Sequence, residues 1–440
     1  TSPVAHQVNY YDTYDFRALT GFTNATYFPV ASVNAKGYLT GSVTAILESG
    51  TKLYSANYYD VKGRMTKKVS SNHMNEYEVD NLTYSFTFTG KPLIIQHIHT
   101  ISKNGIQAGT QTEIYTYTYD HAERVTKTQY ALNGNIVTLA TNTYDNLGRL
   151  LTKSPHGSSI NKLTYTYNLR DWLTEIKSAK FTQNLYYNTG NNTACYNGNI
   201  SSMTWKSGTE SATRGYKFTY DNLNRMKNAV YGEGTTISAN AGRFSENITG
   251  YDRNGNITSL QRYGKSSGTA YGIIDNLTIA YTGNQLKYAN DAATDPLYNG
   301  AFNFVDGSNS TGNEYIFDRN GNLQQDYNKK ISKIQYNQLN LPSTQQFTNG
   351  NRADYLYGAD GVKRRVTHKT AIANISVPMG QIKELTSGQV SQTHTTDYCG
   401  NVIYENGIPV KLLTEAGYVT LADSKYHYFV QDHLGNNRVV

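Results

Sequence analysis

The sequence is poor in cysteine, because Cys195 and Cys399 are the only two among 440 residues. Two cysteines are too few for a disulfide framework, and they lack the paired spacing of a zinc site. A single bridge and two free thiols both remain open. No segment approaches the run of about 18 apolar residues that a membrane-spanning helix needs, so no membrane span is expected.

The opening residues, TSPVAHQVNYYD, lack the basic stretch followed by an apolar stretch that marks a secretory signal. The chain starts without Met and stops within the strand-like stretch NNRVV. We therefore expect both ends to be cuts in a longer protein, and a signal sequence that has been removed remains open.

Apolar residues are also scarce for a chain of this length. Hydrophobic residues make up 38% of the sequence and charged residues 17%, which is low for a compact enzyme with a large core. Tyrosine fills the gap, with 39 Tyr against 13 Phe and 2 Trp. Tyrosine joins an apolar ring to a polar tip. This composition therefore favours a thin wall with partly buried, partly solvated faces over a solid apolar core.

The formal charge of +7 would suit an anionic partner if the basic residues were clustered. They are not. The nearest basic runs are VKRRV (362–366) and RMTKKV (64–69), and each follows a predicted turn, which is typical of a solvated strand end. No motif of a nucleic-acid-binding fold accompanies them, so no nucleic acid is expected as a partner.

Helical periodicity is nearly absent, whereas apolar and polar residues alternate throughout. Examples are EIYTYTYD (113–120), KLTYTYN (162–168) and YKFTYD (216–221). Alternation with a period of two predicts β-strands. In the first strand Tyr115, Tyr117 and Tyr119 are expected to share one face.

Each such strand runs into a turn of the form Tyr-Asp-x-x-Gly, followed by Arg or Asn and an aliphatic residue. Asp accepts a bond from the backbone two residues on, and Gly takes the positive φ that follows a type I turn in a bulged hairpin. Gly255 and Gly321 are therefore predicted to have positive φ. The residues assigned to this structural motif are Tyr59, Asp60, Gly63, Arg64, Tyr144, Asp145, Gly148, Arg149, Tyr251, Asp252, Gly255, Asp318 and Gly321.

The turn recurs about every 19 to 25 residues, which indicates one hairpin per repeat. Propeller blades need about 40 residues and four strands each, so a spiral of hairpins fits better. Loops between hairpins are expected around 176–212, 230–247, 263–272, 288–313 and 371–395. We predict one continuous domain, with an initial segment (1–57), hairpin repeats (58–425) and the start of a terminal core motif (426–440).

The recurring hairpins and the ending YHYFVQDHLGNNRVV (426–440) resemble the YD-repeat shell of the rearrangement hotspot (Rhs) proteins. The terminal core of that family is marked by Asp-His-Leu-Gly, which here is Asp432, His433, Leu434 and Gly435, with Arg438 after it. The stretches RDWLTEI (170–176), YDNLNRM (220–226), IDNLTIAYTGNQL (274–286) and YNQLNLP (336–342) resemble the bacterial branch, whose members are large secreted polymorphic toxins.

The resemblance implies an all-β fold of repeated antiparallel hairpins, in a long spiralling sheet that forms part or all of a hollow shell. It implies a secreted, extracellular or cell-surface location. The implied partners are the protein's own C-terminal effector domain and components of a secretion machinery. In many members an autoproteolytic segment follows the Asp-His-Leu-Gly core, and this chain stops before any such segment, so no residue here inherits that role.

The sequence predicts no catalytic, cofactor-binding or metal-binding residue. Asp252, Asn254 and Asn256 do not match an EF-hand loop, because Gly255 is fourth and Tyr263 is twelfth, so a turn is favoured. His97 and His99 share a face of LIIQHIH (93–99) with no third ligand identifiable nearby, which favours a pair at the surface or in the wall.

His433 follows Asp432 directly, and neighbouring residues of a strand point to opposite faces. A structural corner is therefore favoured over proton transfer between them.

The leading hypothesis is a non-catalytic β-shell that encloses and carries a C-terminal effector. We expect the natural chain to continue past Val440 with a further hairpin and then a compact domain. The alternative is an extracellular adhesion or glycan-binding module, as in the YD shells of teneurins, and an enzyme is a distant third. Tyrosine rings aimed into a cavity favour the carrier, whereas rings gathered at solvent-facing loop tips favour the binding module.

Overall fold

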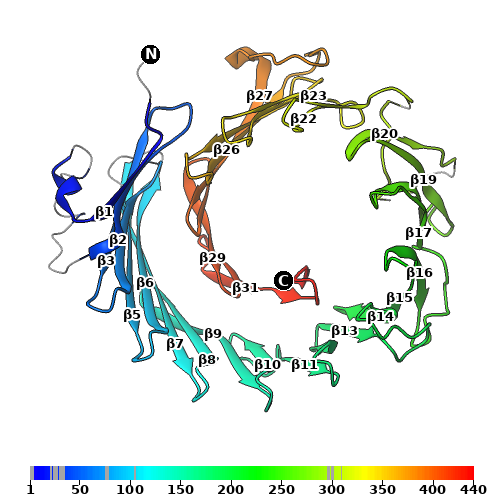
Figure 1. The fold of residues 1–440 in the computed structure, drawn as a ribbon, viewed down its shortest axis with the longest axis horizontal. Coiled ribbons are helices and arrows are strands. Elements are labelled where there is room, and N and C mark those ends of the chain that lie inside the picture. Colours follow the sequence, from blue (N-terminus) through cyan, green and yellow to red (C-terminus); the bar gives the residue numbers. More distant parts are fainter. Residues whose placement is uncertain are drawn as a thin grey trace.

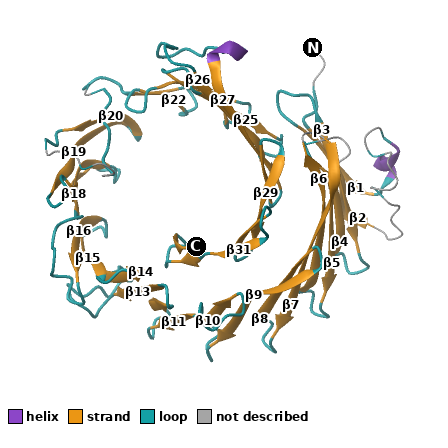
Figure 2. Cartoon of the chain, turned by 180° about the vertical axis from the view of Figure 1, so that it is seen from behind, coloured by secondary structure: helices purple, strands orange, loops and turns teal. Residues whose placement is uncertain are grey.

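The structure is a computed structural model that describes residues 4–19, 22, 28, 35–74, 79–103, 106–294, 298, 302–308 and 310–440. Its regular elements are almost entirely β-strands, and successive strands pair antiparallel along the chain. This confirms the predicted all-β fold of repeated antiparallel hairpins. The two helices found among the described residues are short 3-10 turns, η1 (Asp15–Ala18) and η2 (Ser387–Gln389), and both lie outside the ring of strands (Figure 2). No helix within the described ranges is long and apolar enough to cross a membrane.

The first sheet contains 20 strands. They are β1 (Gln7–Asp12), β2 (Ala35–Ala45), β3 (Lys52–Tyr59), β4 (Met65–Ser71), β5 (Val79–Phe86), β6 (Pro92–Lys103), β7 (Ile106–Tyr119), β8 (Val125–Leu132), β9 (Asn135–Tyr144), β10 (Leu150–Pro155), β11 (Leu163–Tyr167), β12 (Leu173–Lys177), β13 (Phe181–Tyr186), β14 (Ser202–Ser207), β15 (Arg214–Tyr220), β16 (Met226–Glu233), β17 (Glu246–Tyr251), β18 (Ile257–Lys265), β19 (Tyr271–Thr282) and β20 (Gln285–Asp291).

The second sheet contains 11 strands, and a separate hairpin follows it. These are β21 (Tyr315–Phe317), β22 (Leu323–Asp326), β23 (Ile331–Tyr336), β24 (Pro342–Phe347), β25 (Arg352–Tyr357), β26 (Lys363–Ala371), β27 (Val390–Cys399), β28 (Val402–Glu405), β29 (Ile408–Thr414), β30 (Gly417–Thr420), β31 (Lys425–Tyr428), and the pair β32 (Val430–Gln431) and β33 (Asn437–Val439). The two sheets adjoin, because the Glu314 amide donates to the carbonyl of Lys287 in β20 over 2.8 Å.

Figure 1 shows the strands arranged as a spiral that overlaps itself. The first sheet runs from the blue N-terminal strands through the cyan and green strands around the ring, and the second sheet completes the circuit. Strands β26–β31 then pass along the inside of β2–β9. We call β2–β9 the outer layer, β26–β31 the inner layer, and the surface where they meet the seam.

Backbone hydrogen bonds join the end of the first circuit to its beginning. The Leu47 amide donates to the Tyr357 carbonyl (2.9 Å), the Ala359 amide donates to the Ala45 carbonyl (2.8 Å), and Ile46 forms an isolated antiparallel bridge with Gly358. The segment after β25 therefore contacts the segment after β2, so the spiral completes one full circuit within this chain.

The C-terminal hairpin β32–β33 extends the inner path past the seam. Val430 packs in a buried cluster with Leu163, Ile176 and Phe181 from the first sheet, and the His433 amide donates to Gln183 Oε1 over 3.1 Å. This hairpin consequently lies on the inner face of β11–β13 (Figure 1).

The hairpin turns share one geometry. In the turn at Asp145, the Asp145 amide donates to the Arg149 carbonyl (2.9 Å) and the Gly148 amide donates to the Asp145 carbonyl (3.0 Å). The pairing register shifts next to Tyr144, as a bulged hairpin requires. The fourth turn residue is left-handed in each of these turns, with positive φ at Gly63, Glu123, Gly148, Asp171, Asn224, Gly255, Gly321, Asn340 and Gly435. The predicted positive φ of Gly255 (87°) and Gly321 (86°) is confirmed.

One predicted loop is wrong. Residues 176–212 contain β13 and β14, which pair with each other over their full length. Polar residues such as Gln183 and Asn184 interrupt the alternation of apolar and polar residues in this hairpin, so the sequence pattern does not predict its strands. Parts of the initial segment 1–57 and of the predicted loop 288–313 lie outside the described residues.

The turn geometry predicts opposite effects of two substitutions at equivalent positions. Gly148→Ala should destabilise the protein by about 1–2 kcal/mol, because an L residue with a side chain resists positive φ. Glu123→Gly should leave stability unchanged or raise it, because Glu123 already has φ of 60°. Urea unfolding of the two variants measures both, and equal midpoints would refute the assignment of this backbone strain.

Candidate functional site

The first candidate site is the set of contacts that joins neighbouring hairpins, which we call the clasp. It starts from the Asp of each turn. Asp145 Oδ1 accepts the amides of Leu147 and Arg149, both over 2.9 Å, and Asp145 Oδ2 accepts Arg149 Nε over 2.7 Å. Asp60 binds the Lys62 and Arg64 amides and the Arg64 side chain in the same way.

The arginine of each turn also reaches the next hairpin. The Arg124 guanidinium lies 4.7 Å from the ring centroid of Tyr144, and its Nη1 donates to the Asp145 carbonyl over 3.4 Å. Arg149 stacks on Tyr167 at 4.8 Å in the same way. The contact combines cation–π attraction with a charge-assisted hydrogen bond.

The tyrosine of each hairpin completes the clasp in the opposite direction. Its hydroxyl donates to a backbone carbonyl of the preceding hairpin, as Tyr59 does to Leu39 (2.7 Å) and Tyr144 does to Val125 (2.8 Å). The same bond is made by Tyr119, Tyr167, Tyr220, Tyr251, Tyr281 and Tyr336. The sequence motif is thus a connector between repeats as well as a turn.

Two hairpins use asparagine instead of arginine. Asp252 Oδ2 accepts Asn256 Nδ2 (2.8 Å), and Asp318 Oδ2 accepts Asn322 Nδ2 (3.0 Å). In both turns the carboxylate is occupied by N–H donors, which is the arrangement of a hairpin turn and not of a calcium loop.

The terminal motif forms another turn of this kind, which corrects the assumption that Asp432 and His433 are strand neighbours. The Asp432 amide donates to the Asn436 carbonyl, and Gly435 has φ of 83°. Asp432 Oδ2 accepts Arg438 Nε over 2.7 Å, and Leu434 is exposed. His433 lies close to Gln183, and burial lowers the pKa of its imidazole.

The second candidate site is the seam, where the wall is two sheets thick. Apolar side chains from β8 and β9 pack there against the inner layer and form the largest buried cluster among the residues that the structure describes. Its members are Tyr130, Leu132, Leu139, Cys399, Val402, Tyr404, Leu412, Ala416 and Val419. Cys399 and Cys195 do not form a disulfide.

Buried polar groups lie beside this cluster. Glu113 is 0% exposed, and its carboxylate accepts a hydrogen bond from the Tyr130 hydroxyl (2.8 Å). Asn401 Nδ2 donates to both carboxylate oxygens, to Oε2 over 2.9 Å and to Oε1 over 3.1 Å. Since Asn401 belongs to the inner layer and Glu113 to β7, this buried carboxylate bonds the two layers together. A buried charge is tolerated only with such complete hydrogen bonding.

His97 and His99 lie next to Glu113, and His99 is fully buried, so a surface position for it is wrong. Asp80 Oδ1 lies 2.8 Å from His97 Nε2 and 2.6 Å from His99 Nδ1. Burial alone would lower the pKa of His97, but its hydrogen bonds to Asp80 and Glu113 raise that pKa to about 9. At Asp80 burial would raise the pKa, but the hydrogen bonds from His97 and His99 outweigh burial and lower it.

A third acid at the seam, Asp397, is bound by a histidine and an arginine. His73 Nε2 lies 2.8 Å and Arg365 Nε 2.6 Å from Asp397 Oδ1. Burial disfavours the charged form, but these two partners outweigh it and lower the pKa of Asp397. Arg364, from the same VKRRV run, pairs with Asp360. The arginines of this run are therefore partly buried and ion-paired, which corrects its interpretation as a solvated strand end.

The third candidate site is a row of aromatic rings on the inner face of β14–β19. Trp205 lies opposite Gln183 in the sheet and packs against the cluster that holds Val430, so its ring faces the inside. Tyr216 stacks on Trp205 with centroids 5.5 Å apart, and the row continues from ring to ring through Tyr231, Phe244 and Tyr271.

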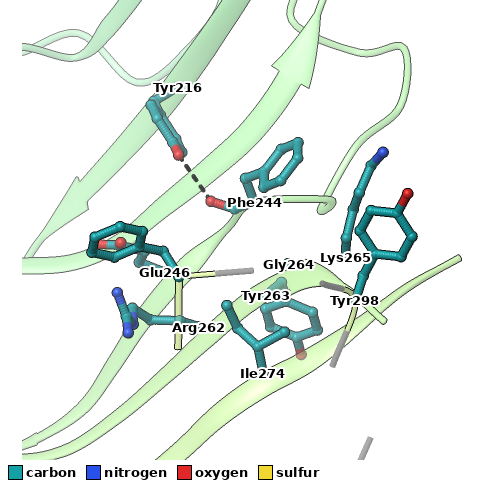
Figure 3. Close-up of a pocket in the computed structure, with 10 residues that line it drawn as sticks. Tyr216, Phe244, Glu246, Arg262, Tyr263, Gly264, Lys265, Ile274 and Tyr298 are labelled. Carbon is teal, nitrogen blue, oxygen red and sulfur yellow. Dashed lines mark hydrogen bonds between the residues drawn. The ribbon is translucent and has the colours of Figure 1, made fainter. Parts of the chain in front are cut away.

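A cavity of about 410 Å³ lies along this row (Figure 3). Tyr216 donates its hydroxyl to the Phe244 carbonyl over 2.9 Å, and Tyr263 and Ile274 line the opposite side. Lys265 lies over the ring of Tyr298 at 5.0 Å. The lining combines flat apolar rings with charged groups, a surface suited to weak contact with an extended polypeptide.

Sequence reasoning missed Asp80, Glu113 and Asp397. Glu113 carries a recognisable signal, since it shares a strand face with Tyr115 and Tyr117, where a carboxylate is out of place. Asp80 and Asp397 carry no such local signal, because their partners come from other strands.

No family model matches the chain, and no curated protein matches it. Among solved structures it is similar to the crystal structure of TcdB2-TccC3, with 14% identity, a TM-score of 0.52, and coverage of 98% of this chain and 22% of that chain. For TcdB2-TccC3-Cdc42 the values are 14%, 0.51, 98% and 25%. For a Tc holotoxin pore of Photorhabdus luminescens with a TccC3 substitution they are 13%, 0.51, 98% and 25%.

The chain therefore spans about a quarter of the length of these structures, at most 25%. At this identity the similarity shows a shared fold. It supports the Rhs-like fold that the repeated hairpins suggest.

The clasp predicts a measurable loss when one hydroxyl is removed. Tyr144→Phe keeps the ring under Arg124 but loses the bond to the Val125 carbonyl, and should cost about 0.5–1.5 kcal/mol in urea unfolding. Tyr196→Phe is the control, because Tyr196 is 64% exposed. An equal effect of the two substitutions would contradict the role of the clasp.

The turn carboxylates predict acid sensitivity. Hydrogen bonds from the arginine side chain and the backbone lower the pKa of Asp60 and of Asp120. Their stabilising effect is complete above the ordinary aspartate pKa of about 3.9 and is lost as the pH falls below it. The urea midpoint should therefore drop between about pH 4 and pH 2.

The matched variant for this experiment is Asp120→Asn together with Asp145→Asn. Asn168 already holds such a turn with its Oδ1, which accepts the amides of Arg170 and Trp172. Because asparagine does not titrate, the double variant should show a shallower fall of the urea midpoint in acid. An unchanged slope would show that these carboxylates do not control acid unfolding.

Proposed function

We propose that this chain forms the wall of a β-shell in a secreted Rhs-type toxin, where it encloses and carries a C-terminal effector without catalysing a reaction itself. The observation that carries the proposal is the direction of the aromatic side chains. The row from Trp205 to Tyr271 faces the inside of the ring, and Tyr115 and Tyr117 face the inner layer.

The distribution of exposed tyrosines favours the carrier over the binding module. Among the described residues only Tyr11, Tyr38, Tyr196 and Tyr298 are substantially exposed, and Tyr298 lines the inner cavity. Rings at the hairpin tips that stack on sugars would require the opposite distribution.

The overlap of the layers supports enclosure. The seam joins the start of the wall to its end through a buried cluster and backbone hydrogen bonds, so the two ends of the circuit overlap and are held together at this place. A segment that follows β33 would begin on the inner face of the wall, beside β11–β13. The effector domain and the secretion machinery are the partners that this role requires.

Limited proteolysis of the full natural protein tests the proposal. In the wild type, a domain following Val440 should resist protease while the shell is folded. Leu412→Asp places a charge in the buried seam and should expose that domain, whereas Leu413→Asp, at an adjacent residue that is 44% exposed, should not. Equal digestion in all three proteins would contradict enclosure, and glycan binding by the outer face would favour the adhesion module.

A further inference from the structure

The cluster of Asp80, His97 and His99 has the donor set of a metal site. One atom from each residue, two imidazole nitrogens and a carboxylate oxygen, lies within 4.8 Å of the others. The three residues come from neighbouring strands, since Asp80 in β5 lies opposite His99 in β6, and His97 is two residues away on the same face. We propose that these three side chains bind a Zn²⁺ ion at the seam.

The donor set suits this ion. Zn²⁺ takes imidazole and carboxylate ligands at about 2.0–2.2 Å, and three protein ligands with one further position is a common arrangement. The ion would replace the protons that now lie between the two imidazoles and Asp80 Oδ1, and binding would release them to solvent. Tetrahedral ligands at this distance lie roughly 3.3–3.5 Å apart, so the three donor atoms need only small side-chain rotations.

The surrounding contacts orient the ligands as in known metal sites. A ligating histidine usually donates its other ring nitrogen to a carboxylate or another acceptor, which fixes the ring. Here His97 Nδ1 lies 3.2 Å from Glu113 Oε1, and His99 Nε2 lies 2.6 Å from the Tyr404 hydroxyl. The Glu113 carboxylate is itself held by Tyr130 and Asn401. In each imidazole one ring nitrogen is therefore fixed by a hydrogen bond to Glu113 or Tyr404, and the other nitrogen points toward Asp80.

Two further observations favour a ligand at this place. Gln111, which lies opposite His99 in β7, is 3% exposed, and its Nε2 has no hydrogen-bond acceptor among the described residues, so this donor is available to an oxygen ligand in the fourth position of the ion. Asp80 and His97 also line a cavity of about 390 Å³ that contains Asn401 and Cys399 from the inner layer. That cavity provides a route for the ion and room for a fourth ligand.

Competition of the tag-free full chain with a chromogenic chelator at neutral pH measures Zn²⁺ binding. The wild type should bind a single ion at this site, and Asp80→Asn and His97→Gln should each weaken binding by more than about 100-fold. Glu113→Gln, which removes the charge behind His97 and one of the two oxygens that accept from Tyr130 and Asn401, should weaken it by about 10–100-fold. Far-UV circular dichroism and the unfolding midpoint without metal identify any variant that does not fold.

The control is His368→Gln, because His368 and His394 face each other across β26 and β27 and offer a second, more exposed pair of imidazoles to an added metal ion. Binding that persists in Asp80→Asn but disappears in His368→Gln would overturn the proposal, as would a wild type that takes up no zinc.

The Co²⁺ spectrum of the wild-type protein depends on no variant. Tetrahedral nitrogen and oxygen ligation should give visible d–d bands without an intense near-ultraviolet band, whereas an intense near-ultraviolet band would identify Cys399 as a ligand in place of Asp80 and refute this ligand set.

Discussion

A wall that is one sheet thick has no core of its own, and the clasp between neighbouring hairpins is what the rest of this structure depends on. A strand ladder satisfies the backbone, but it does not fix the angle between one hairpin and the next. The Asp of each turn holds the loop, the Arg stacks on the next aromatic ring, and the Tyr hydroxyl bonds to the previous carbonyl. These contacts are partly polar and work at a half-wet surface, which explains why tyrosine replaces leucine and isoleucine in the composition.

The chemistry changes where the wall becomes double. Between the layers an ordinary apolar core packs around Val402 and Leu412, and buried acids lie at the margin of that core. Glu113 bonds to Asn401 of the inner layer, and Asp397 bonds to His73 and Arg365, so neither buried carboxylate lacks a hydrogen-bond partner. Networks of this kind fix one alignment of two surfaces, because sliding either layer would leave a charge buried without a partner.

The repeating elements could be predicted from the sequence because their causes are local. Asp252 and Gly255 are separated by two residues, and this spacing is sufficient to specify a bulged turn and the strands on either side. The sequence does not predict the hairpin β13–β14, because its inward positions include Gln183, a polar residue that is buried and only 2% exposed. Asp432 was placed in a strand because its turn lacks the preceding tyrosine. The cluster of Asp80, His97 and His99 was missed for another reason: it depends on strand register and on Tyr404, which is 305 residues from His99.

The seam has a consequence for the number of repeats. In an open solenoid each repeat touches only its neighbours, so repeats can be gained or lost during evolution with little harm to the others. Here the hairpins between β9 and β26 set how far the chain travels before it meets itself, and the bond between Leu47 and Tyr357 forms only at one such distance. Duplication of a single hairpin would carry Asn401 away from Glu113 and Asp397 away from His73. The number of repeats in this stretch is therefore constrained as a whole, like the circumference of a closed ring, whereas a substitution inside one repeat leaves this distance unchanged.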